Sequence, residues 1–324
     1  MLKRKISANI LDIKEKLGLP FYMNQRKFSA EYSVKIKSLA DNNAVTAILP
    51  VPENISGQEI IETPSFNLLP AQKGTDNIYG NKYASWHLDM KKNEEVEIIE
   101  NFKIRTRPFA LSGKNVFQVS DYKKNKEYKL YCRPNGLIHP EDSRVKHLAG
   151  QIAGNQKKDV IKVLKAINGH IVNNLKYGQP IEGLYSDLDA LTKPEVDCGG
   201  FASLYVSLAI ACGIPSRIVS GFWAGYENNT MHAWAESMLP DGTWLPADPA
   251  TQQLRKLGRT KKFGGFGKVG SDRIILSKGC DLKLVSGADN LNISILQNPL
   301  INPGKGELSI QIKCEFSAKI INNN

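Results

Sequence analysis

The second half of the chain contains a thiol, Cys198, and two side chains that could activate it, His232 and Asp248. A thiol needs a base to become a strong nucleophile near neutral pH, and an imidazole serves as such a base. A carboxylate can then fix the tautomer and the orientation of that imidazole. These residue types, in this chain order, therefore make nucleophilic catalysis by Cys198 the chemistry to test.

The sequence around Cys198 predicts that this residue begins a helix. Apolar residues follow with the spacing of a buried helical face, at positions 201, 204, 205, 208, 209 and 212. Gly213-Ile214-Pro215 then predicts the end of the helix. The positive end of the helix dipole would favour a thiolate, and Gly199 and Gly200 would leave room for a substrate backbone. The alternative is a buried structural cysteine.

Strands are predicted to position the other two residues. Residues 217–223, 231–238 and 244–249 are typical of strands, and residues 239–243 are typical of a turn. The turn would place His232 and Asp248 on adjacent antiparallel strands. His232 lies farther from the turn than Asp248, so we expect the two residues to be offset along the strands. Side-chain reach or a bulge must then close the gap between them.

Four motifs, in this order, resemble the core of the transglutaminase-like superfamily, in particular its microbial branch, often described as cysteine proteases. The motifs are Asp197-Cys198-Gly199-Gly200-Phe201-Ala202, Gly213-Ile214-Pro215-Ser216-Arg217, His232-Ala233-Trp234-Ala235-Glu236 and Trp244-Leu245-Pro246-Ala247-Asp248-Pro249. The resemblance covers roughly residues 145 to 280. The C-G-[SA]-C-[WY] signature of papain itself is absent from the sequence.

The resemblance implies an α+β fold, a papain-like transglutaminase core in which the Cys-bearing helix packs on an antiparallel sheet. Cys198 would be the nucleophile, His232 the general base and acid, and Asp248 the orienting carboxylate. The backbone N–H of Cys198 would help to form the oxyanion hole. The second donor of the family is a side chain upstream of the cysteine. Asn174 and Tyr177 are candidates because they stand at the end of the preceding helix.

The implied reaction is acyl transfer on a peptide or isopeptide amide of a protein or peptide substrate. The Cys198 thiolate would attack the carbonyl, His232 would protonate the leaving amine, and a thioester would form. Water then gives hydrolysis, whereas a second amine gives transamidation, and the residues do not decide between the two. The acidic loops of calcium-dependent relatives are not found, so we expect neither a metal nor a cofactor.

Several neighbouring residues have simpler interpretations. We interpret Trp234 and Trp244 as core aromatics, although Trp234 could shield the His–Asp pair from water. Glu236 is interpreted as a polar partner under the sheet, and Asp197 as the N-cap of the Cys198 helix. Cys212 continues the buried helical stripe and is interpreted as inert.

The remainder of the chain is predicted to form three further regions. Residues 1–20 are typical of an amphipathic helix. Residues 21–131 alternate in short strands, including 28–36, 96–106, 116–119 and 128–131, around a loop-rich stretch at 64–80, which predicts a β-sandwich. Residues 132–285 would form the catalytic core, with a helix over 159–175. Residues 286–324 would supply strands that complete the sheet.

The net charge is +11, and basic residues gather at 123–126 and 255–268. This charge leaves open a protein that binds polyanions through its basic loops, but no recognition motif predicts specific nucleic-acid binding. The glycine-rich segment 263–268 is interpreted as a mobile loop, because it lacks the GK[ST] of a phosphate cradle.

The five cysteines are widely spaced and include no CxxC pair, which predicts neither a disulfide framework nor a zinc site. A reducing compartment fits this usage. No apolar stretch follows the basic N-terminus and no run could span a membrane, so we expect a cytoplasmic protein. A non-catalytic module that keeps the fold remains the other alternative, and the oligomeric state stays open.

Overall fold

The computed structural model describes residues 24–41, 43–112, 116–156, 158–287, 289–303 and 309–321. The helix predicted for residues 1–20 lies outside these ranges. The described chain is α+β, as predicted, and its paired strands are antiparallel.

The chain divides into two compact units that are not consecutive in sequence. We call one the helical unit, which comprises Arg107–Val219 and His232–Ser271 together with Asn24. The sheet unit comprises the described parts of Gln25–Thr106, Ser220–Met231 and Asp272–Asn324. In this division, residues 107–131 cluster with the helices, and the C-terminal strand pairs with the first strand.

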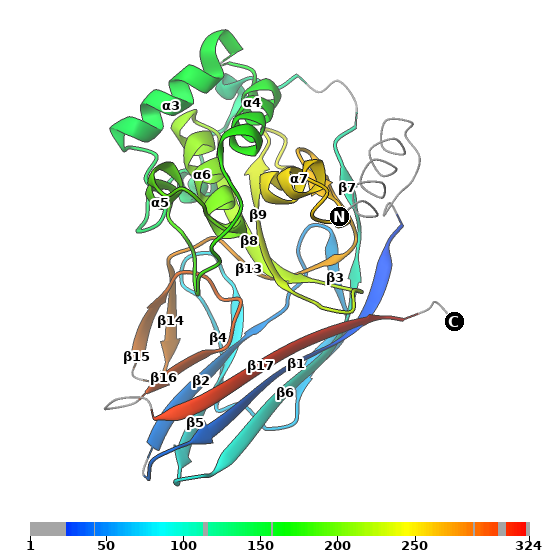
Figure 1. The fold of residues 1–324 in the computed structure, drawn as a ribbon, viewed down its shortest axis with the longest axis vertical. Helices are drawn as coiled ribbons and strands as arrows, with labels where there is room; N and C mark the ends of the chain where they lie inside the picture. The colour runs from blue at the N-terminus through cyan, green and yellow to red at the C-terminus, as the bar shows by residue number, and fades with distance from the viewer. Residues whose placement is uncertain are drawn as a thin grey trace. The chain divides into compact units, whose positions relative to one another are not determined.

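The helical unit is built around one helix, α6, which begins at Cys198 as predicted. Its helices are α2 (Lys126–Tyr131), α3 (Ser143–Ala153), α4 (Val160–Asn174), α5 (Asp187–Thr192), α6 (Cys198–Ala211) and α7 (Pro249–Lys256), with short 3-10 turns η1 (Val119–Asp121) and η2 (Gly154–Gln156). Every residue of α6 from Gly199 to Ala209 is buried, and α3, α4, α5 and α7 all contact it (Figure 1). A helix that is apolar on all sides is typical of a protein core. The sequence predicted that only one face of this helix would be buried, whereas all of its faces are.

The predicted helix over 159–175 is confirmed as α4. Asp159 caps it, since the aspartate side chain accepts a hydrogen bond from Lys162 N at 3.1 Å. The buried residues of α4 include Val160, Ile167 and Ile171, which lie along one face.

The prediction of two short strands before the helices, at residues 116–119 and 128–131, is wrong. Residues 119–121 form η1, and residues 126–131 form α2, which begins where the Asn125 side chain accepts a hydrogen bond from Tyr128 N. The helix puts Tyr128 and Tyr131 three residues apart on one face. Tyr131 is buried there, and the Tyr128 hydroxyl donates to Gly213 O at 3.1 Å.

Three strands carry the segments that follow α6: β8 (Ser216–Trp223), β9 (Met231–Met238) and β10 (Trp244–Ala247). β10 lies beside β9, and β9 beside β8. The glycine-rich segment is not merely a loop. It supplies β11 (Gly264–Gly265) and β12 (Lys268–Val269), which form a small sheet with β7 (Phe109–Ala110), and Gly267 turns between them with φ +67°.

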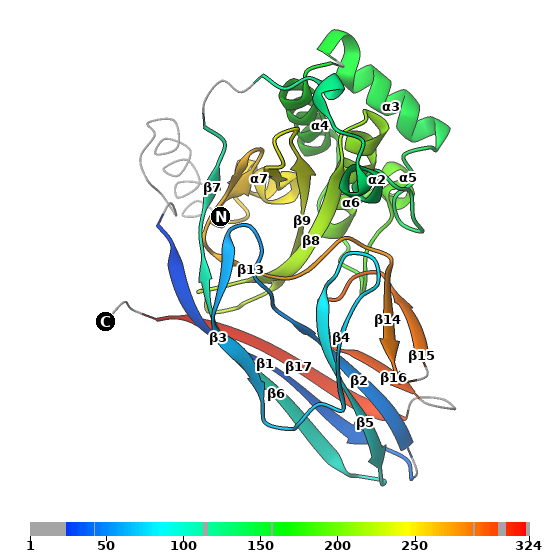
Figure 2. The same cartoon turned by 180° about the vertical axis from the view of Figure 1, so that it is seen from behind.

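The sheet unit contains the predicted sandwich. Its strands are β1 (Arg26–Ser38), β2 (Asn43–Val51), β3 (Gln58–Phe66), β4 (Gln72–Thr75), β5 (Lys82–Met90), β6 (Glu95–Thr106), β13 (Arg273–Lys278), β14 (Leu282–Ser286), β15 (Asp289–Ile293), β16 (Leu300–Pro303) and β17 (Ile310–Ile320). Two of the sheets have the strand orders β17-β1-β6-β3 and β16-β2-β5-β4 (Figure 2). β4 and the end of β3 lie in the stretch expected to be loop-rich. Both are edge strands, which is why Pro64 is tolerated in β3.

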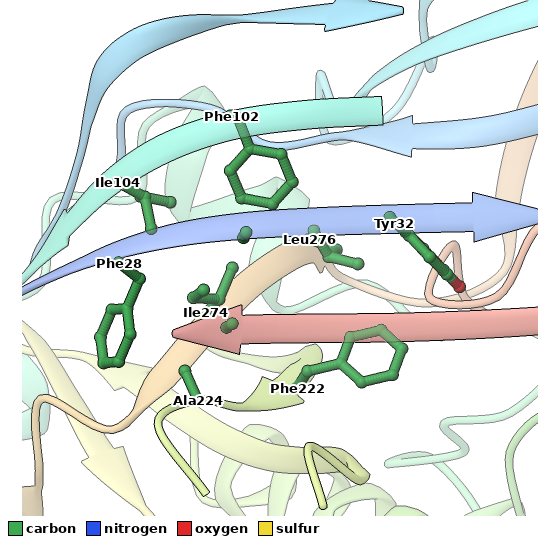
Figure 3. Close-up of a cluster of buried hydrophobic side chains, with 10 residues drawn as sticks. Phe28, Tyr32, Phe102, Ile104, Phe222, Ala224, Ile274 and Leu276 are labelled. Atoms are coloured by element: carbon green, nitrogen blue, oxygen red, sulfur yellow. The ribbon is translucent and has the colours of Figure 1, made fainter. Parts of the chain in front are cut away.

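A buried aromatic cluster joins the distant segments of the sheet unit (Figure 3). Phe28 and Tyr32 from β1 and Phe102 from β6 meet Phe222 at the end of β8 and Ile274 on β13. The rings of Tyr32 and Phe222 meet edge to face, with centroids 5.4 Å apart. This cluster fixes the far end of β8 inside the sheet unit.

Candidate active site

The histidine and the aspartate of the predicted triad are joined by a hydrogen bond. His232 Nε2 lies 2.8 Å from Asp248 Oδ2, and both side chains are buried. In the register of β9 and β10, Ala247 pairs with Ala235. Continuing this register places Asp248 opposite Trp234, which is two residues along β9 from His232. The predicted offset is confirmed, and side-chain reach closes it.

Asp248 is held on its other side by a helix that the sequence did not predict. β10 ends at Ala247, one residue before Asp248, which becomes the N-cap of α7. Its Oδ1 accepts a hydrogen bond from Thr251 N at 2.9 Å, and Pro249 occupies the first helical position. One carboxylate oxygen is thus fixed by the helix while the other holds the imidazole.

Trp234 covers the same face of β9 as His232. The two rings are nearly parallel, with centroids 5.9 Å apart and an interplanar angle of 20°, and the indole is buried. Its interpretation as a core aromatic beside the His–Asp pair is confirmed. On the α7 side, Thr251 Oγ1 lies 3.4 Å from His232 Nε2.

The sulfur of Cys198 lies beside the residue that follows His232. The Ala233 backbone N–H donates a hydrogen bond to it, and the charge of Asp248 is close enough to act on it. Burial is the main cause that raises the pKa of the Cys198 thiol to about 12, and the charge of Asp197 adds to the effect. These surroundings oppose ionisation of the sulfur, against the expectation that the helix start alone favours thiolate.

Asp197 is the N-cap of α6, as predicted. Its Oδ1 accepts hydrogen bonds from Gly199 N at 2.9 Å and Gly200 N at 3.3 Å. Its Oδ2 accepts a third from Ile181 N at 3.3 Å. Burial raises the pKa of this carboxyl group, whereas the backbone donors lower it.

The two glycines after Cys198 serve packing, which corrects their predicted role of leaving space for substrate. A Cβ on Gly199 would lie 2.6 Å from Leu184 Cδ1, and a Cβ on Gly200 would lie 2.6 Å from Val196 Cβ. Both glycines are buried. They let α6 start against its own preceding segment, so any substrate space must lie elsewhere around the sulfur.

Of the two oxyanion-hole candidates, the structure places only Tyr177 beside Cys198. The Tyr177 hydroxyl and the Cys198 sulfur share a hydrogen bond, and burial followed by the charge of Cys198 raises the pKa of Tyr177. Its ring packs on Phe201 with centroids 6.0 Å apart. Asn174 is exposed, and its Nδ2 donates to His170 O at 2.8 Å within α4. Asn174 is therefore not brought to the thiol.

Gln253 is a supporting residue that sequence reasoning missed. This buried side chain from α7 accepts a hydrogen bond from Tyr177 N at 3.1 Å through Oε1. Its Nε2 donates to Val172 O at 2.9 Å and to Leu175 O at 2.5 Å, at the end of α4. The only available signal was the position of Gln253 five residues after Asp248, which means nothing until α7 is known.

Glu236 is confirmed as a polar partner under the sheet. Its Oε2 accepts hydrogen bonds from Arg217 Nε at 3.0 Å and Nη2 at 2.7 Å, and both residues are buried. The guanidinium of Arg217 stacks 3.7 Å from the centroid of the Trp244 ring. This pair ties β8, β9 and β10 together and leaves His232 as the candidate acid and base.

The structure thus has an α+β core with a cysteine at a helix start, a histidine on β9 and an aspartate at the N-cap of α7. Residues 146–249 match the family model of the transglutaminase-like superfamily, and the match includes all three residues. The resemblance predicted from the motifs is thereby confirmed for this segment. No curated protein matches the chain.

A solved structure with a TM-score above 0.5 shares the fold. A candidate cysteine protease from Cytophaga hutchinsonii is 17% identical, with a TM-score of 0.57, over 93% of each chain. The periplasmic domain of TgpA from Pseudomonas aeruginosa is 14% identical, with a TM-score of 0.38, over 69% of this chain and 76% of its own. Within the ranges that the structure describes, no helix is both long and apolar enough to cross a membrane.

Proposed function

We propose that the protein is a thiol-dependent acyl-transfer enzyme that hydrolyses or transamidates peptide or isopeptide amides. Cys198 is the nucleophile, His232 the general base and acid, and Asp248 the orienting carboxylate. The observation that carries the proposal is the 2.8 Å contact of His232 Nε2 with Asp248, next to a sulfur that is hydrogen-bonded by Ala233 N–H.

We infer the roles of the two ring nitrogens of His232 from its contact with Asp248. Nε2 keeps its proton and donates a hydrogen bond to Oδ2, so the neutral imidazole carries its lone pair on Nδ1. Nδ1 accepts the Cys198 proton as the sulfur attacks the carbonyl carbon. Because the resting thiol has a raised pKa, this transfer accompanies the attack rather than preceding it.

Collapse of the tetrahedral intermediate breaks the carbon–nitrogen bond. The proton on Nδ1 passes to the leaving amine, and the acyl group remains on Cys198 as a thioester. Water or a second amine then attacks the thioester carbonyl and gives up a proton to Nδ1. The carbon–sulfur bond breaks, and the proton on Nδ1 passes to the sulfur to regenerate the thiol. Asp248 stays ionised throughout and stabilises the imidazolium that forms in each half-reaction.

Two donors are proposed for the oxyanion. The first is the Cys198 backbone N–H, because the first amides of a helix have no partner within it. The second is the Tyr177 hydroxyl, whose raised pKa keeps it a neutral donor beside the sulfur. Asn174 is withdrawn from this role, since its amide bonds back onto α4.

The substrate is proposed to be a protein or peptide, and the compartment a reducing one such as the cytoplasm. An unoxidised Cys198 is required for the reaction, and the cysteines form no disulfide in the described ranges.

A panel of peptide and amine substrates followed by mass spectrometry tests the proposal. Wild-type protein should form a thioester on Cys198 and release amine, and Cys198→Ala should do neither. Cys212→Ala, at the other end of the same helix, is the matched control and should retain activity. Turnover that survives in Cys198→Ala would refute the proposal, while the product mixture separates hydrolysis from transamidation.

A further inference from the structure

β17 is an eleven-residue strand at the edge of a sheet in the sheet unit (Figure 1). β1 pairs with one side of β17 along its whole length without a register shift, from Phe28 opposite Ile320 to Ser38 opposite Ile310. Among the described residues, no strand pairs with the other side. A long, regular edge strand presents a row of backbone donors and acceptors to which a further strand can be added.

The other three edge strands of the sandwich carry features that oppose such an addition. β3 contains Pro64, and its register with β6 shifts twice. β4 has only four residues, and β16 has four residues and ends in Pro303. Proline, bulges and shortness are the usual ways in which proteins protect an edge. β17 has none of them, so its edge is open to pairing.

The hydrogen bonds at the two ends of β17 show which of its backbone groups point away from β1. Ile321 N donates to Lys27 O at 3.0 Å, and Leu39 N donates to Ser309 O at 2.7 Å. Both pairs continue the register of β1 and β17, so the odd-numbered positions bond towards β1. Because bonded pairs alternate along an antiparallel ladder, the even-numbered positions direct their N–H and C=O groups outward.

The outward side of β17 is bonded near its C-terminal end and open in the middle. Gly225 N donates to Ala318 O at 3.0 Å, which confirms the outward direction of the even-numbered positions. No described residue bonds the outward backbone groups of Ile312, Cys314 and Phe316. We call the segment from Ile312 to Phe316 the open edge.

The even-numbered side chains of β17 lie on the inner face of the sandwich. They pair with buried residues of β1, and the Phe316 ring stacks on Phe222 with centroids 4.1 Å apart. Ile312 is nevertheless 47% exposed and Cys314 is exposed, because no further strand flanks them. A strand added at the open edge would cover this apolar surface with its own side chains, which favours association.

The charges on the opposite face of β17 indicate a second copy of this strand as the partner. Lys313 and Glu315 are both exposed and flank Cys314, and their Nζ and Oε1 atoms lie 2.6 Å apart. If two copies pair antiparallel about Cys314, Lys313 of each copy lies directly opposite Glu315 of the other. Pairing about Lys313 or about Glu315 would instead oppose two lysines or two glutamates, which is destabilising. Charge complementarity therefore selects the register centred on Cys314.

We propose that the protein forms a symmetric dimer in which two copies of β17 pair antiparallel about Cys314. Ile312 of each copy then exchanges backbone hydrogen bonds with Phe316 of the other, and Cys314 does so with its counterpart. Lys313 and Glu315 pair across the interface at positions where side chains approach closely. The dimer goes beyond the proposed acyl transfer and does not depend on the chemistry of the candidate thiol site.

Sedimentation velocity of the full chain over a range of concentrations tests the proposal. Wild-type protein should show a reversible equilibrium of monomer and dimer. Lys313→Glu and Glu315→Lys should each raise the dissociation constant of the dimer by about tenfold or more, because each variant opposes like charges twice. The double variant Lys313→Glu/Glu315→Lys restores opposite charges and should return this constant to within about threefold of the wild-type value.

Two further variants separate the open edge from a general effect of charge or folding. Lys319→Glu changes the net charge as Lys313→Glu does, on the same strand but outside the open edge, and should leave the dissociation constant within about twofold. Cys314→Pro removes one outward N–H and no hydrogen bond to β1. This variant should therefore keep the circular dichroism spectrum of wild type and lose the dimer.

Three results would overturn the proposal. A chain that stays monomeric at every concentration would assign the open edge to a different partner. A dimer that survives in correctly folded Cys314→Pro would use another surface. Equal weakening by Lys319→Glu and Lys313→Glu, or a double variant as weak as the single ones, would show that net charge rather than pairing of Lys313 with Glu315 controls association.

Discussion

Gln253 holds Tyr177 in place by accepting a hydrogen bond from its backbone N–H at 3.1 Å. The same side chain also donates to the carbonyls of Val172 and Leu175 at the end of α4. Because Gln253 belongs to α7, one short helix supports both sides of the candidate site. Its first turn fixes Asp248 on His232, and its second fixes the segment that brings Tyr177 to the sulfur.

Replacing Gln253 by Leu should reduce kcat by about tenfold or more while KM changes little, because Tyr177 loses its position and an oxyanion donor is displaced. If Gln253 acts through Tyr177, the double variant Gln253→Leu/Tyr177→Phe should be no slower than Tyr177→Phe alone. Fully additive losses would contradict this coupling. Gln252→Leu serves as control, since Gln252 Oε1 accepts from Asn168 Nδ2 rather than from Tyr177.

Asp248→Asn separates the two tasks of this residue. Asparagine is also a good N-cap, so α7 should survive and the circular dichroism spectrum should not change. The amide cannot hold the imidazole in the same tautomer, and kcat should fall by roughly a thousandfold or more. Asp241→Asn, at an exposed turn, is the control and should be fully active. A triad role for Asp248 is incompatible with near-normal turnover by Asp248→Asn.

The motifs could be recognised in the sequence because each is a short run of neighbouring residues. The alternating strands were also predictable, since Phe28, Ala30 and Tyr32 in β1 repeat with a period of two. What the sequence could not provide was α7. Pro249 is equally consistent with the end of a strand and with the first residue of a helix. Only the capping hydrogen bond of Asp248, seen in the structure, distinguishes the two.

The supporting contacts of the site were unpredictable for a different reason. Gln253 and Tyr177 are far apart in sequence, and neither carries a pattern that pairs them. Gly199 and Gly200 were misinterpreted because a glycine beside a nucleophile suits substrate access and tight packing alike, and only the positions of Leu184 and Val196 distinguish the two. Tertiary proximity, rather than local propensity, determines all of these roles.

Alkylation of Cys198 should depend on pH and on His232. Burial raises the thiol pKa to about 12, so the resting protein holds little thiolate near neutrality, and the iodoacetamide rate should rise steadily from pH 6 to pH 9. His232→Ala should slow labelling at pH 7, because the thiol then loses its base. Mass spectrometry of the labelled peptide gives both rates. A rate that is already maximal at pH 6 would mean a preformed thiolate instead.

Glu100 on β6 should make the protein less stable as the pH rises. It is fully buried, its carboxyl oxygens have no hydrogen-bond partner among the described residues, and burial raises its pKa well above the usual value. The folded state thus keeps a proton that the unfolded state releases above about pH 4.5, so stability falls as pH rises from there towards the folded-state pKa.

Glu100→Gln removes this titration. The free energy of unfolding of the variant, relative to that of wild type, should therefore be higher at pH 8 than at pH 5. Urea unfolding at the two pH values measures the difference. Glu97→Gln, exposed on the same strand, is the matched control and should leave the pH dependence unchanged. Parallel pH profiles for wild type and Glu100→Gln would show that Glu100 is already ionised in the folded protein.

Gly200→Ala tests whether the glycines after the nucleophile are required for packing. The new Cβ would lie 2.6 Å from Val196 Cβ, so α6 or the segment before it must shift, and unfolding free energy should fall by about 1–3 kcal/mol. Gly150→Ala in α3 is the opposite case, because no described atom lies within 4 Å of its Cβ. That variant should be stabilised by about 0.5–1 kcal/mol, since alanine favours helix. Unfolding by urea gives both values, and a gain of stability in Gly200→Ala would return these glycines to the role of leaving space for substrate.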